Sequence, residues 1–564
     1  MTNMVKTVFD QLKSCLDGAV LKCMNDGIFP KGDIPSYKIE IPADTSHGDF
    51  TSNIAMVSAK AFKLASKAIA EKILAAVSFD STYIIGGEIA GPGFINFKVD
   101  PVWFCDVVKG ISTDKENYGK SDIGGGKKIN VEFVSANPTG PMHMGNARGG
   151  ALGDGIAAAL EYTGHDVTRE FYVNDAGNQI AKFGMSLEVR YIQQLKGEDS
   201  IEFPEDGYKG DDIIDLAKLY IEKHGDKLLD VDSETRRKTL SDFAVPINMS
   251  RMKSDLEKYR IDYDVWFYES TLHNTGAVDK TLEFLKKQGV TYEKDGALWL
   301  KSDDDSEEDK DNVLVRANGY PTYFAVDIAY HYNKLITRGF HKAIDIWGTD
   351  HHGHVARMER AVAAMGREGD LDIVLLQLVR LMKDGAVTKM SKRTGRAITL
   401  SDLLEDVPID SARFFFNMRE PSTHMDFDLD LAVKQDNDNP VYYVQYAHAR
   451  ICSIIKNLNA EGYNLRECTD DELKLLNTPE ETELIRFLAT LPNTIIDAAT
   501  YYNPAVITRY IMDLATKFHR FYASCRVKGQ DESLLQARLN LCNCSKMVFE
   551  NILKMLKISA PEVM

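Results

Sequence analysis

The sequence contains no apolar run that approaches the length of a membrane span. A transmembrane helix needs about 20 consecutive apolar residues, whereas the amphipathic N-terminus is interrupted at Lys6, Asp10, Lys13 and Asp17. A secretory signal peptide also needs an unbroken apolar segment, and this N-terminus offers none. We therefore expect no membrane partner and a cytoplasmic location.

Cysteine is scarce and irregularly spaced. The chain has 564 residues and 8 cysteines, no two of which form a C-x-x-C pair, and Cys542 and Cys544 are separated by a single residue. Disulfide frameworks and structural zinc sites both require paired spacing. We expect reduced thiols and no tightly bound protein metal.

The sequence also lacks an excess of basic residues. Its formal net charge is −17, which by itself argues against a polyanionic partner such as RNA. The argument is weak, because a folded enzyme binds nucleic acid through a local basic patch rather than through its mean charge. Charge alone therefore leaves RNA binding open.

What is present is a length sufficient for roughly two to four domains. Lys128 to Val134 alternates like a strand, Arg148 to Thr163 has a helical pattern, and Asp166 to Val173 is again strand-like. Strand, helix and strand in this order predict a βαβ unit, and hence a parallel α/β sheet.

The rest of the chain divides around that unit. Residues 1–115 mix a helix with short strands and precede a glycine-rich linker. Residues 125–410 predict a Rossmann-like parallel sheet with a charged helical insertion near 190–290, and residues 411–564 are typical of long amphipathic helices. The expected fold class is α/β, with an N-terminal α+β module and a C-terminal all-α domain.

A proline- and glycine-containing turn lies between the first strand and its helix. It runs from Asn137 to Asn146 and includes His143 and Gly145. A helix N-terminus favours phosphate through its amides and dipole, glycine permits close approach of a nucleotide, and the imidazole can donate to a phosphate oxygen. A lone histidine in a turn is more often structural, so this motif alone does not decide.

A second motif places two lysines three residues apart, 389 − 143 = 246 residues beyond His143. It reads Lys389-Met390-Ser391-Lys392-Arg393. Two ammonium groups in a loop of this kind suit a triphosphate, and a solvated basic loop is the alternative.

Together the motifs resemble the H-I-G-H and K-M-S-K-S signatures of class I aminoacyl-tRNA synthetases. The resemblance implies a set of catalytic residues: His143, Asn146, Lys389 and Lys392. It implies ATP contacts, with Mg²⁺ accompanying ATP, from His143, Gly145, Met390 and Ser391.

The two signatures each depart from the family pattern at one position. Asn146 replaces the second histidine, which keeps a hydrogen-bond donor but not a charge. Arg393 replaces the final serine, a smaller departure. The implied chemistry is attack of an amino-acid carboxylate on the α-phosphate, then transfer of the acyl group to a tRNA ribose hydroxyl. Such steps depend on positioning and charge neutralisation.

Further segments resemble the arginyl enzymes. Tyr323 and Asp327 are four apart and share one helical face, and Glu132 lies in the first strand; salt-bridge roles are the alternative for both carboxylates. The strings Val131 to Pro141 and Tyr323 to His331 resemble the arginyl pattern. The resemblance implies a set of arginine-binding residues, with Asp327 and Tyr323 at the guanidinium: Glu132, Ser135, Asn137, Tyr323 and Asp327.

The segment Trp347 to His354 resembles the adenosine-side G-x-D-H-H-G of that family. The resemblance implies ATP contacts from Gly348, Asp350 and His351. By spacing alone the same cluster could hold a metal, although no cysteine joins it.

The flanking regions fit the same family. Ile89 to Phe97 resembles part of the arginyl N-terminal module that reads the tRNA elbow, which implies tRNA contacts from Phe94 and Asn96, with core packing as the alternative for Phe94. Asn439 to Arg450 resembles the start of the anticodon-binding region. The resemblance implies an arginine–tRNA ligase whose partners are L-arginine and tRNA(Arg), with no obligate protein partner.

Three alternatives remain open at this point. A synthetase-like RNA-binding protein without catalysis would be expected to lose its phosphate-facing residues, and both signatures keep them. The cysteinyl enzyme needs a zinc thiolate pocket, which the cysteine spacing does not supply. A small-molecule nucleotidyltransferase would not need the long helical region after the second signature.

Overall fold

The computed structural model describes residues 2–42, 44–301, 312–388 and 398–564. The second signature, Lys389 to Arg393, lies outside the described residues. Among the helices described, none is long and apolar enough to cross a membrane.

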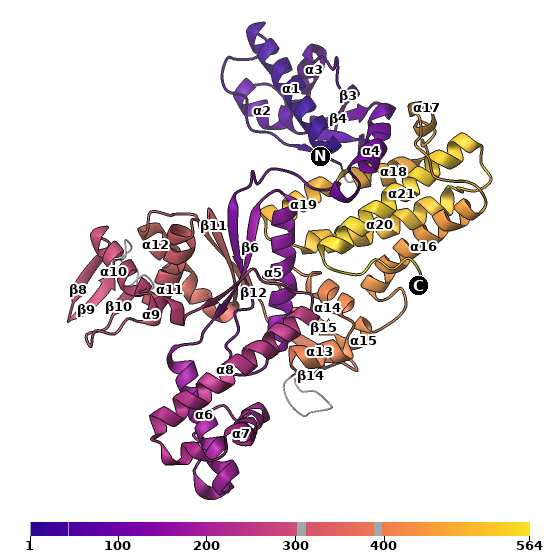
Figure 1. Cartoon of the computed structure of the whole chain (residues 1–564). Helices are drawn as coiled ribbons and strands as arrows, with labels where there is room; N and C mark the ends of the chain where they lie inside the picture. The colour runs from indigo at the N-terminus through magenta and orange to yellow at the C-terminus, as the bar shows by residue number, and fades with distance from the viewer. Residues whose placement is uncertain (1, 43, 302–311, 389–397) are drawn as a thin grey trace.

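The chain begins with an α+β module on a four-stranded antiparallel sheet of order β1-β2-β4-β3 (Figure 1). Its strands are β1 (Ile39–Glu40), β2 (Phe50–Ser52), β3 (Ile84–Ala90) and β4 (Phe94–Val99). Its helices are α1 (Met4–Asn25), α2 (Ile54–Phe62), α3 (Ser66–Ala76) and α4 (Pro101–Asp114).

A five-stranded parallel sheet forms the centre of the molecule, in the order β12-β11-β5-β6-β7. Its strands are β5 (Lys128–Glu132), β6 (Asp166–Val173), β7 (Val265–Tyr268), β11 (Lys342–Gly348) and β12 (Leu371–Leu376). The carboxyl ends of parallel strands share one edge, which is where open α/β sheets bind ligands. The predicted parallel sheet is confirmed.

Helix α5 (Met144–Tyr162) connects β5 to β6 and is almost entirely buried. It begins four residues before the predicted start at Arg148, because His143 caps it. Glycines let it approach the sheet closely: a Cβ on Gly153 would lie 2.2 Å from Cγ of Phe133.

A helical subdomain follows β6 and has a hydrophobic core of its own. It contains α6 (Gly177–Lys196), α7 (Asp211–His224) and α8 (Ser233–Lys258). The helical stretch expected near 190–290 is interrupted after α8, because β7 returns to pair with β6 in the central sheet. The sequence pattern missed β7 because it is only four residues long and lies between charged helices.

A second small unit lies between β7 and β11. It contains α9 (Ser270–Asn274), α10 (Ala277–Lys287) and an antiparallel sheet of β8 (Thr291–Lys294), β9 (Ala297–Leu300) and β10 (Asn312–Val315). Helix α11 (Tyr323–Tyr332) packs on this unit and continues as a π-helical turn, η6 (Asn333–Thr337). Helix α12 (His352–Ala364) connects β11 to β12.

The segment after β12 forms a fourth sheet, of order β14-β13-β15. It comprises β13 (Val379–Lys383), β14 (Ala386–Thr388) and β15 (Met425–Asp428), with helices α13 (Leu400–Asp406), α14 (Ile409–Phe416) and α15 (Leu429–Ala432). Because β15 pairs with β13, the all-helical region begins at α16 rather than near residue 411.

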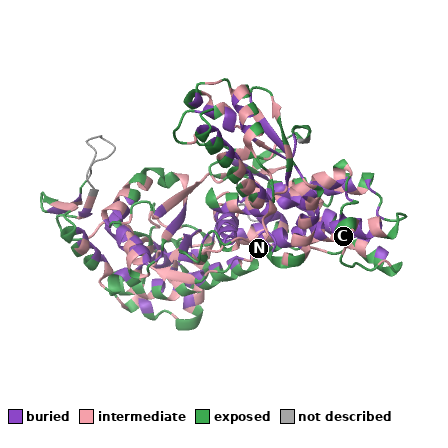
Figure 2. Cartoon of the chain, turned by 90° about the horizontal axis from the view of Figure 1, so that it is seen from above, coloured by how far each residue is buried: buried purple, intermediate pink, exposed green. Residues whose placement is uncertain are grey.

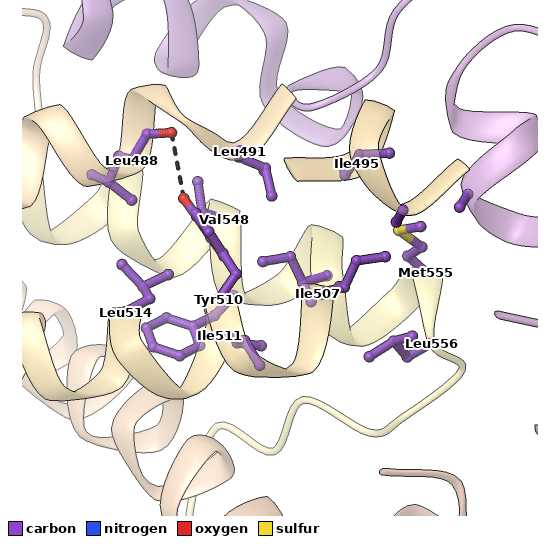
Figure 3. Packing of buried hydrophobic residues seen from close by; sticks show 14 of the residues in the cluster. Leu488, Leu491, Ile495, Ile507, Tyr510, Ile511, Leu514, Val548, Met555 and Leu556 are labelled. Carbon is purple, nitrogen blue, oxygen red and sulfur yellow. Dashed lines mark hydrogen bonds between the residues drawn. The ribbon is translucent and has the colours of Figure 1, made fainter. Parts of the chain in front are cut away.

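The C-terminal region is a helical bundle around a continuous apolar core (Figure 3). It contains α16 (Pro440–Ala460), α17 (Asp470–Leu473), α18 (Pro479–Ala489), α19 (Leu491–Thr500), α20 (Ala505–Ser524) and α21 (Glu532–Met555). Tyr510 is buried in this core, and its hydroxyl donates to the carbonyl oxygen of Phe487 at 3.1 Å. The buried hydroxyl of Tyr510 therefore finds its hydrogen-bond partner within the bundle.

The N-terminal module rests on the bundle. Lys109 pairs with Asp470, Arg486 pairs with Asp49, and the hydroxyl of Tyr118 donates to the carbonyl oxygen of Leu488 at 3.0 Å. Figure 2 shows buried residues concentrated inside these parts and exposed residues along their outer faces.

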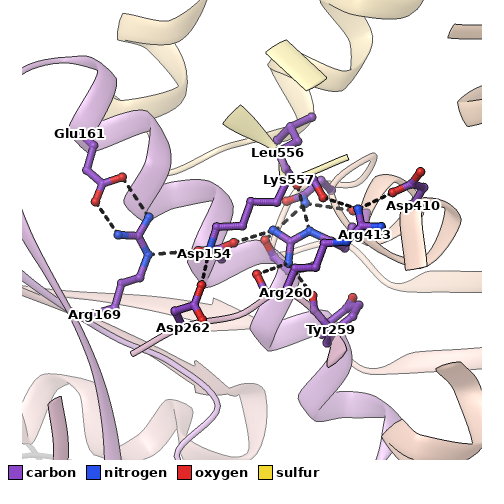
Figure 4. A network of polar contacts seen from close by, with 12 residues as sticks. Asp154, Glu161, Arg169, Tyr259, Arg260, Asp262, Asp410, Arg413, Leu556 and Lys557 are labelled. Carbon is purple, nitrogen blue, oxygen red and sulfur yellow. Dashed lines mark hydrogen bonds and ion pairs between the residues drawn. The ribbon is translucent and has the colours of Figure 1, made fainter. Parts of the chain in front are cut away.

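The end of the bundle also returns to the central domain. Lys557, just after α21, places Nζ 3.2 Å from Oδ1 of Asp154 in the middle of α5 (Figure 4). Arg413 of α14 donates to the carbonyl oxygen of Leu556 at 2.9 Å. The C-terminal residues thus contact the helix that carries the first signature.

Candidate active site

The first part of the site is the sharp turn at the end of β5. Val134 and Ser135 have φ values of 71° and 43°, a region that a β-branched residue rarely adopts. The turn directs the Ser135 hydroxyl back to Glu132, where it donates to Oε1 at 2.9 Å. The same hydroxyl oxygen accepts from the amide of Tyr172 on β6 at 3.1 Å. The strained turn therefore fixes Glu132 and Ser135 side by side.

Helix α11 brings Asp327 to the same edge of the sheet. Its carboxylate lies 3.0 Å from Nε2 of His354 on α12, and its side chain is 42% exposed. The His354 ring stacks on Trp347, with ring centroids 5.7 Å apart. An anion that is oriented by a histidine yet still open to solvent can accept a cationic ligand.

The side chains just described line one cavity of about 240 Å³. Of the residues singled out from the sequence, five line it: Glu132, Ser135, Asp327, Gly348 and His351. Tyr172, His354 and Asp345 also line it and were not assigned from sequence. His354 could have been found, because it stands in the Trp347 to His354 segment, whereas no local signal marks Tyr172.

Two predicted arginine contacts lie elsewhere. Tyr323 is 55% exposed and lines a neighbouring cavity that shares Asp327 and His354 with the first; its hydroxyl oxygen accepts from the amide of Asn178 at 3.2 Å. Asn137 is exposed on the loop after β5 and lines neither cavity. Their roles stay predictions.

The first signature forms the N-cap of α5. Nδ1 of His143 accepts from the amide of Gly145 at 3.0 Å, and Oδ1 of Asn146 accepts from the amide of His143 at 2.9 Å. Because Nδ1 is an acceptor, a neutral His143 carries its proton on Nε2, and desolvation lowers the pKa of this histidine. Nε2 is thus a donor at a helix N-terminus, as phosphate binding requires.

Gly145 and Asn146 have clear structural reasons to be present. A Cβ on Gly145 would lie 2.9 Å from Cε1 of the His143 ring, so only glycine leaves room for the cap. The side chain of Asn146 completes the capping box. A catalytic role for Asn146 stays a prediction.

The residues that flank the second signature lie beside the first. Thr399 forms an antiparallel bridge with His143, and the amide of Leu400 donates to the carbonyl oxygen of Met142 at 2.9 Å. The predicted residues Lys389, Met390, Ser391 and Lys392 are outside the described part of the chain. Thr399, which follows the second signature closely in the sequence, nevertheless lies next to His143.

The predicted adenosine side lies where β11 ends. Gly348 is the last residue of β11. The turn η7 (Thr349–His351) follows it and contains Asp350 and His351, which are both exposed. No cluster of three or more His, Cys, Asp or Glu side chains that could hold a metal occurs within the described residues.

The two predicted tRNA contacts in the N-terminal module differ in exposure. Phe94 is half-buried at the start of β4, whereas Asn96 is 5% exposed and its side-chain oxygen accepts from the Thr51 hydroxyl at 2.8 Å. Direct base contact is easier to reconcile with Phe94 than with Asn96.

Three family descriptions match successive parts of the chain. The "Arginyl tRNA synthetase N terminal domain" matches residues 10–99, "tRNA synthetases class I (R), catalytic domain" residues 107–434, and "DALR anticodon binding domain" residues 444–564. The arginine–tRNA ligase of Acetivibrio thermocellus is 54% identical over 100% of both chains, and that of Ruminiclostridium cellulolyticum is 53% identical over 100% of both. The chain belongs to the arginyl-tRNA synthetases.

Solved structures agree with this membership. An arginyl-tRNA synthetase structure from Campylobacter jejuni is 32% identical, with a TM-score of 0.72, and covers 83% of this chain and 100% of its own. The Thermus thermophilus arginyl-tRNA synthetase has a TM-score of 0.76, covers 98% of this chain and 100% of its own, and at 21% identity supports the fold alone. The predicted fold class, family and ligase function are confirmed: an arginyl-tRNA synthetase uses ATP to join arginine to tRNA.

Proposed function

We propose that the 240 Å³ cavity binds the arginine that this arginyl-tRNA synthetase activates. The observation that carries the proposal is that Glu132 and Ser135 at the end of β5 meet Asp327 of α11, almost 200 residues later in the chain, in one cavity at the carboxyl edge of the parallel sheet. Carboxylates in a partly desolvated cavity suit a guanidinium, which presents donors in a fixed plane. Tyr323 and Asn137 approach this group when arginine is bound.

ATP, entering with Mg²⁺ on its phosphates, lies between the α5 N-terminus and the turn after β11. His143 donates from Nε2 to a phosphate oxygen, Gly145 allows close approach, and Gly348, Asp350 and His351 contact the adenosine side. Lys389 and Lys392, aided by Met390 and Ser391, neutralise the triphosphate. Charge stabilisation of this kind accelerates phosphoryl-centre displacement without a protein nucleophile.

The cognate RNA is tRNA(Arg), which is bound at two places outside the catalytic domain. The N-terminal module contacts the elbow of the tRNA through Phe94 and Asn96, and the helical bundle after residue 440 contacts the anticodon. The contact between module and bundle supports a continuous surface for one tRNA.

Charging of purified tRNA with each of the twenty amino acids tests the proposal. Arginine alone is expected to yield a stable product, and only with tRNA(Arg). Equal charging by a second amino acid, or efficient charging of a non-cognate tRNA, would contradict the assignment.

A further inference from the structure

Two carboxylates face each other at the floor of the arginine cavity. Glu132 on β5 and Asp345 on β11 occupy directly paired positions of neighbouring parallel strands, and they are 7% and 1% exposed. Like charges in opposed strand positions destabilise a sheet, and burial strengthens their repulsion. Without compensation, one of the two would take up a proton near neutral pH.

Lys334 lies between these carboxylates and is fully buried. Its Nζ donates to Oε2 of Glu132 at 2.5 Å and to Oδ1 of Asp345 at 2.8 Å, and it lies 4.4 Å from the centroid of the Tyr330 ring. The residue stands on η6, a π-helical turn, and such turns occur frequently at functional sites. Lys334 does not line the cavity, so it acts on a ligand only through its neighbours.

Asp345 has a second cationic partner. Nε2 of His331 is 2.9 Å from Oδ2 of Asp345, and Nδ1 of His331 is 2.8 Å from the carbonyl oxygen of Asp327. Both ring nitrogens face acceptors, an arrangement that favours the imidazolium; although burial opposes this charge, Asp345 raises the pKa of His331. Despite burial, Lys334 and His331 together keep the pKa of Asp345 low, so Lys334 does not have to neutralise Asp345 alone and also stabilises the charge of Glu132.

Glu132 is the group in this cluster that most needs help to stay ionised. Burial raises the pKa of its carboxyl, Lys334 lowers it, and Asp345 and Glu170 raise it again. The ionisable groups around it come from every neighbouring element: Lys334 of η6, Asp345 of β11, Glu170 and Tyr172 of β6, Asp327, Tyr330 and His331 of α11, and Tyr263.

We propose that Lys334 is a positioning residue for the amino-acid substrate, which keeps Glu132 ionised and fixes its carboxylate against Ser135 for a cationic group of arginine. This inference rests on the proposed placement of arginine at Glu132. Lys334 holds Oε2, and Ser135 holds Oε1, so the plane of the carboxylate is set before the ligand arrives. Preorganisation of this kind improves binding because less order is lost on association.

The test is Lys334→Met in the full chain, assayed by ATP–pyrophosphate exchange with saturating tRNA between about pH 6 and pH 9. The arginine KM is expected to rise about tenfold or more, and to fall again as pH is raised, because Glu132 then ionises unaided. The KM for ATP should stay within about twofold. Lys334→Arg, which keeps the charge, should recover part of the loss.

Arg367→Met is the matched control. Arg367 donates to the carbonyl oxygen of Leu335 in the same π-helical turn at 2.9 Å and pairs with Asp370, which neither lines the cavity nor belongs to the groups that act on Glu132. It should lower stability as Lys334→Met does, yet leave the arginine KM and its pH profile close to wild type. If the two variants change arginine KM alike, or if KM in Lys334→Met is independent of pH, Lys334 is only structural and the inference is overturned.

If Lys334→Met does not fold, the double variant Lys334→Met/Asp345→Asn replaces it, because it removes the repelling anion together with the cation. The double variant should fold and should show a weaker pH dependence of the arginine KM than any single Lys334 variant that folds. A fully wild-type arginine KM in the double variant would also overturn the inference.

Glu132→Gln distinguishes failure of the proposed arginine site from failure of the inference about Lys334. If Glu132→Gln leaves arginine KM unchanged, the proposed arginine site is wrong; if it raises KM while Lys334→Met does not, only the inference about Lys334 fails.

Discussion

Asp154 of α5 and Arg413 of α14 form an ion pair that is shut off from solvent, with 1% and 0% of their side chains exposed and 2.5 Å between Oδ2 and Nη2. Arg169 and Lys557 also contact Asp154 (Figure 4). One carboxylate thus holds together the signature helix, the central sheet and the residues after α21. Despite burial, these cations lower the pKa of Asp154, so it is charged at neutral pH.

Asp154→Asn should therefore lower the free energy of unfolding by about 3–5 kcal/mol, because it leaves the buried guanidinium of Arg413 uncompensated. Denaturant titration measures the change. Asp242→Asn serves as the control, since Asp242 pairs with Lys238 on the surface, with 64% and 75% exposure, and should change stability by less than about 1 kcal/mol. If the two variants lower the free energy of unfolding equally, the buried network around Asp154 contributes no more to stability than a surface ion pair.

Asp327→Asn tests the guanidinium contact. The amide removes the charge that faces the cavity but keeps the shape, so the loss in kcat/KM for arginine should be about 3 kcal/mol, with ATP binding little changed. Steady-state kinetics for both substrates measure this. Asp370→Asn is the control, because Asp370 precedes β12 at the opposite edge of the sheet and pairs with Arg367. An arginine KM and turnover within about twofold of wild type would remove Asp327 from the pocket.

His143 combines a cap and a proposed phosphate contact, and two substitutions separate these roles. His143→Ala removes both, whereas His143→Asn restores a good N-cap acceptor for the Gly145 amide. Both should slow single-turnover adenylate formation by about 10²–10³-fold, and only the alanine variant should also lose about 1 kcal/mol of stability. A normal rate in the asparagine variant would leave His143 with a capping role alone.

Lys392, outside the described residues, carries a parallel prediction. Its ammonium is expected to neutralise developing charge on the triphosphate, so Lys392→Ala should slow adenylate formation by a similar factor of about 10²–10³ without lowering the thermal midpoint. An unchanged single-turnover rate would contradict that role.

Local spacing predicted where some elements lie, but not what their side chains bind. It placed Glu132 in the first strand and put Tyr323 and Asp327 on one helical face, whereas only the resemblance to the arginyl segments implied that Glu132, Ser135 and Asp327 bind the amino acid. The contact of Lys334 with Glu132 depends instead on how η6 packs under the sheet. No local pattern encodes that packing, and the helical period gave no sign that α11 would continue as a π-helical turn.

The bundle supplies a pH-dependent contact at His448, which is buried on α16. Nδ1 faces the carbonyl oxygen of Pro561 at 2.9 Å and Nε2 lies 3.4 Å from Oε1 of Glu550. Burial alone lowers the pKa of His448, but Cys452, Glu550 and the Pro561 carbonyl together raise it to about 9. The protonated ring thus ties the C-terminal residues to α16.

A histidine pKa raised above its unfolded value of about 6.5 stabilises the fold fully below that pH and loses its contribution as pH rises through about 9. The contribution is at most about 3 kcal/mol. The difference in thermal midpoint between wild type and His448→Gln should therefore be larger at about pH 6 than above about pH 9. A difference that is independent of pH would show that the ring is neutral throughout.

Phe94 carries the last prediction, because its half-buried ring stands where the β3–β4 hairpin turns, whereas Phe97 on the same strand is fully buried. If a base of the tRNA elbow stacks on the ring, Phe94→Ala should weaken tRNA binding by about 1–3 kcal/mol. If activation of arginine depends on bound tRNA, ATP–pyrophosphate exchange should fall as well and recover partly when the tRNA concentration is raised. Phe97→Leu is the control: it disturbs the module core and should lower the thermal midpoint while the folded protein keeps its tRNA affinity. Normal affinity together with a lowered midpoint in Phe94→Ala would make Phe94 a core residue, and the elbow contact would have to lie elsewhere on the module.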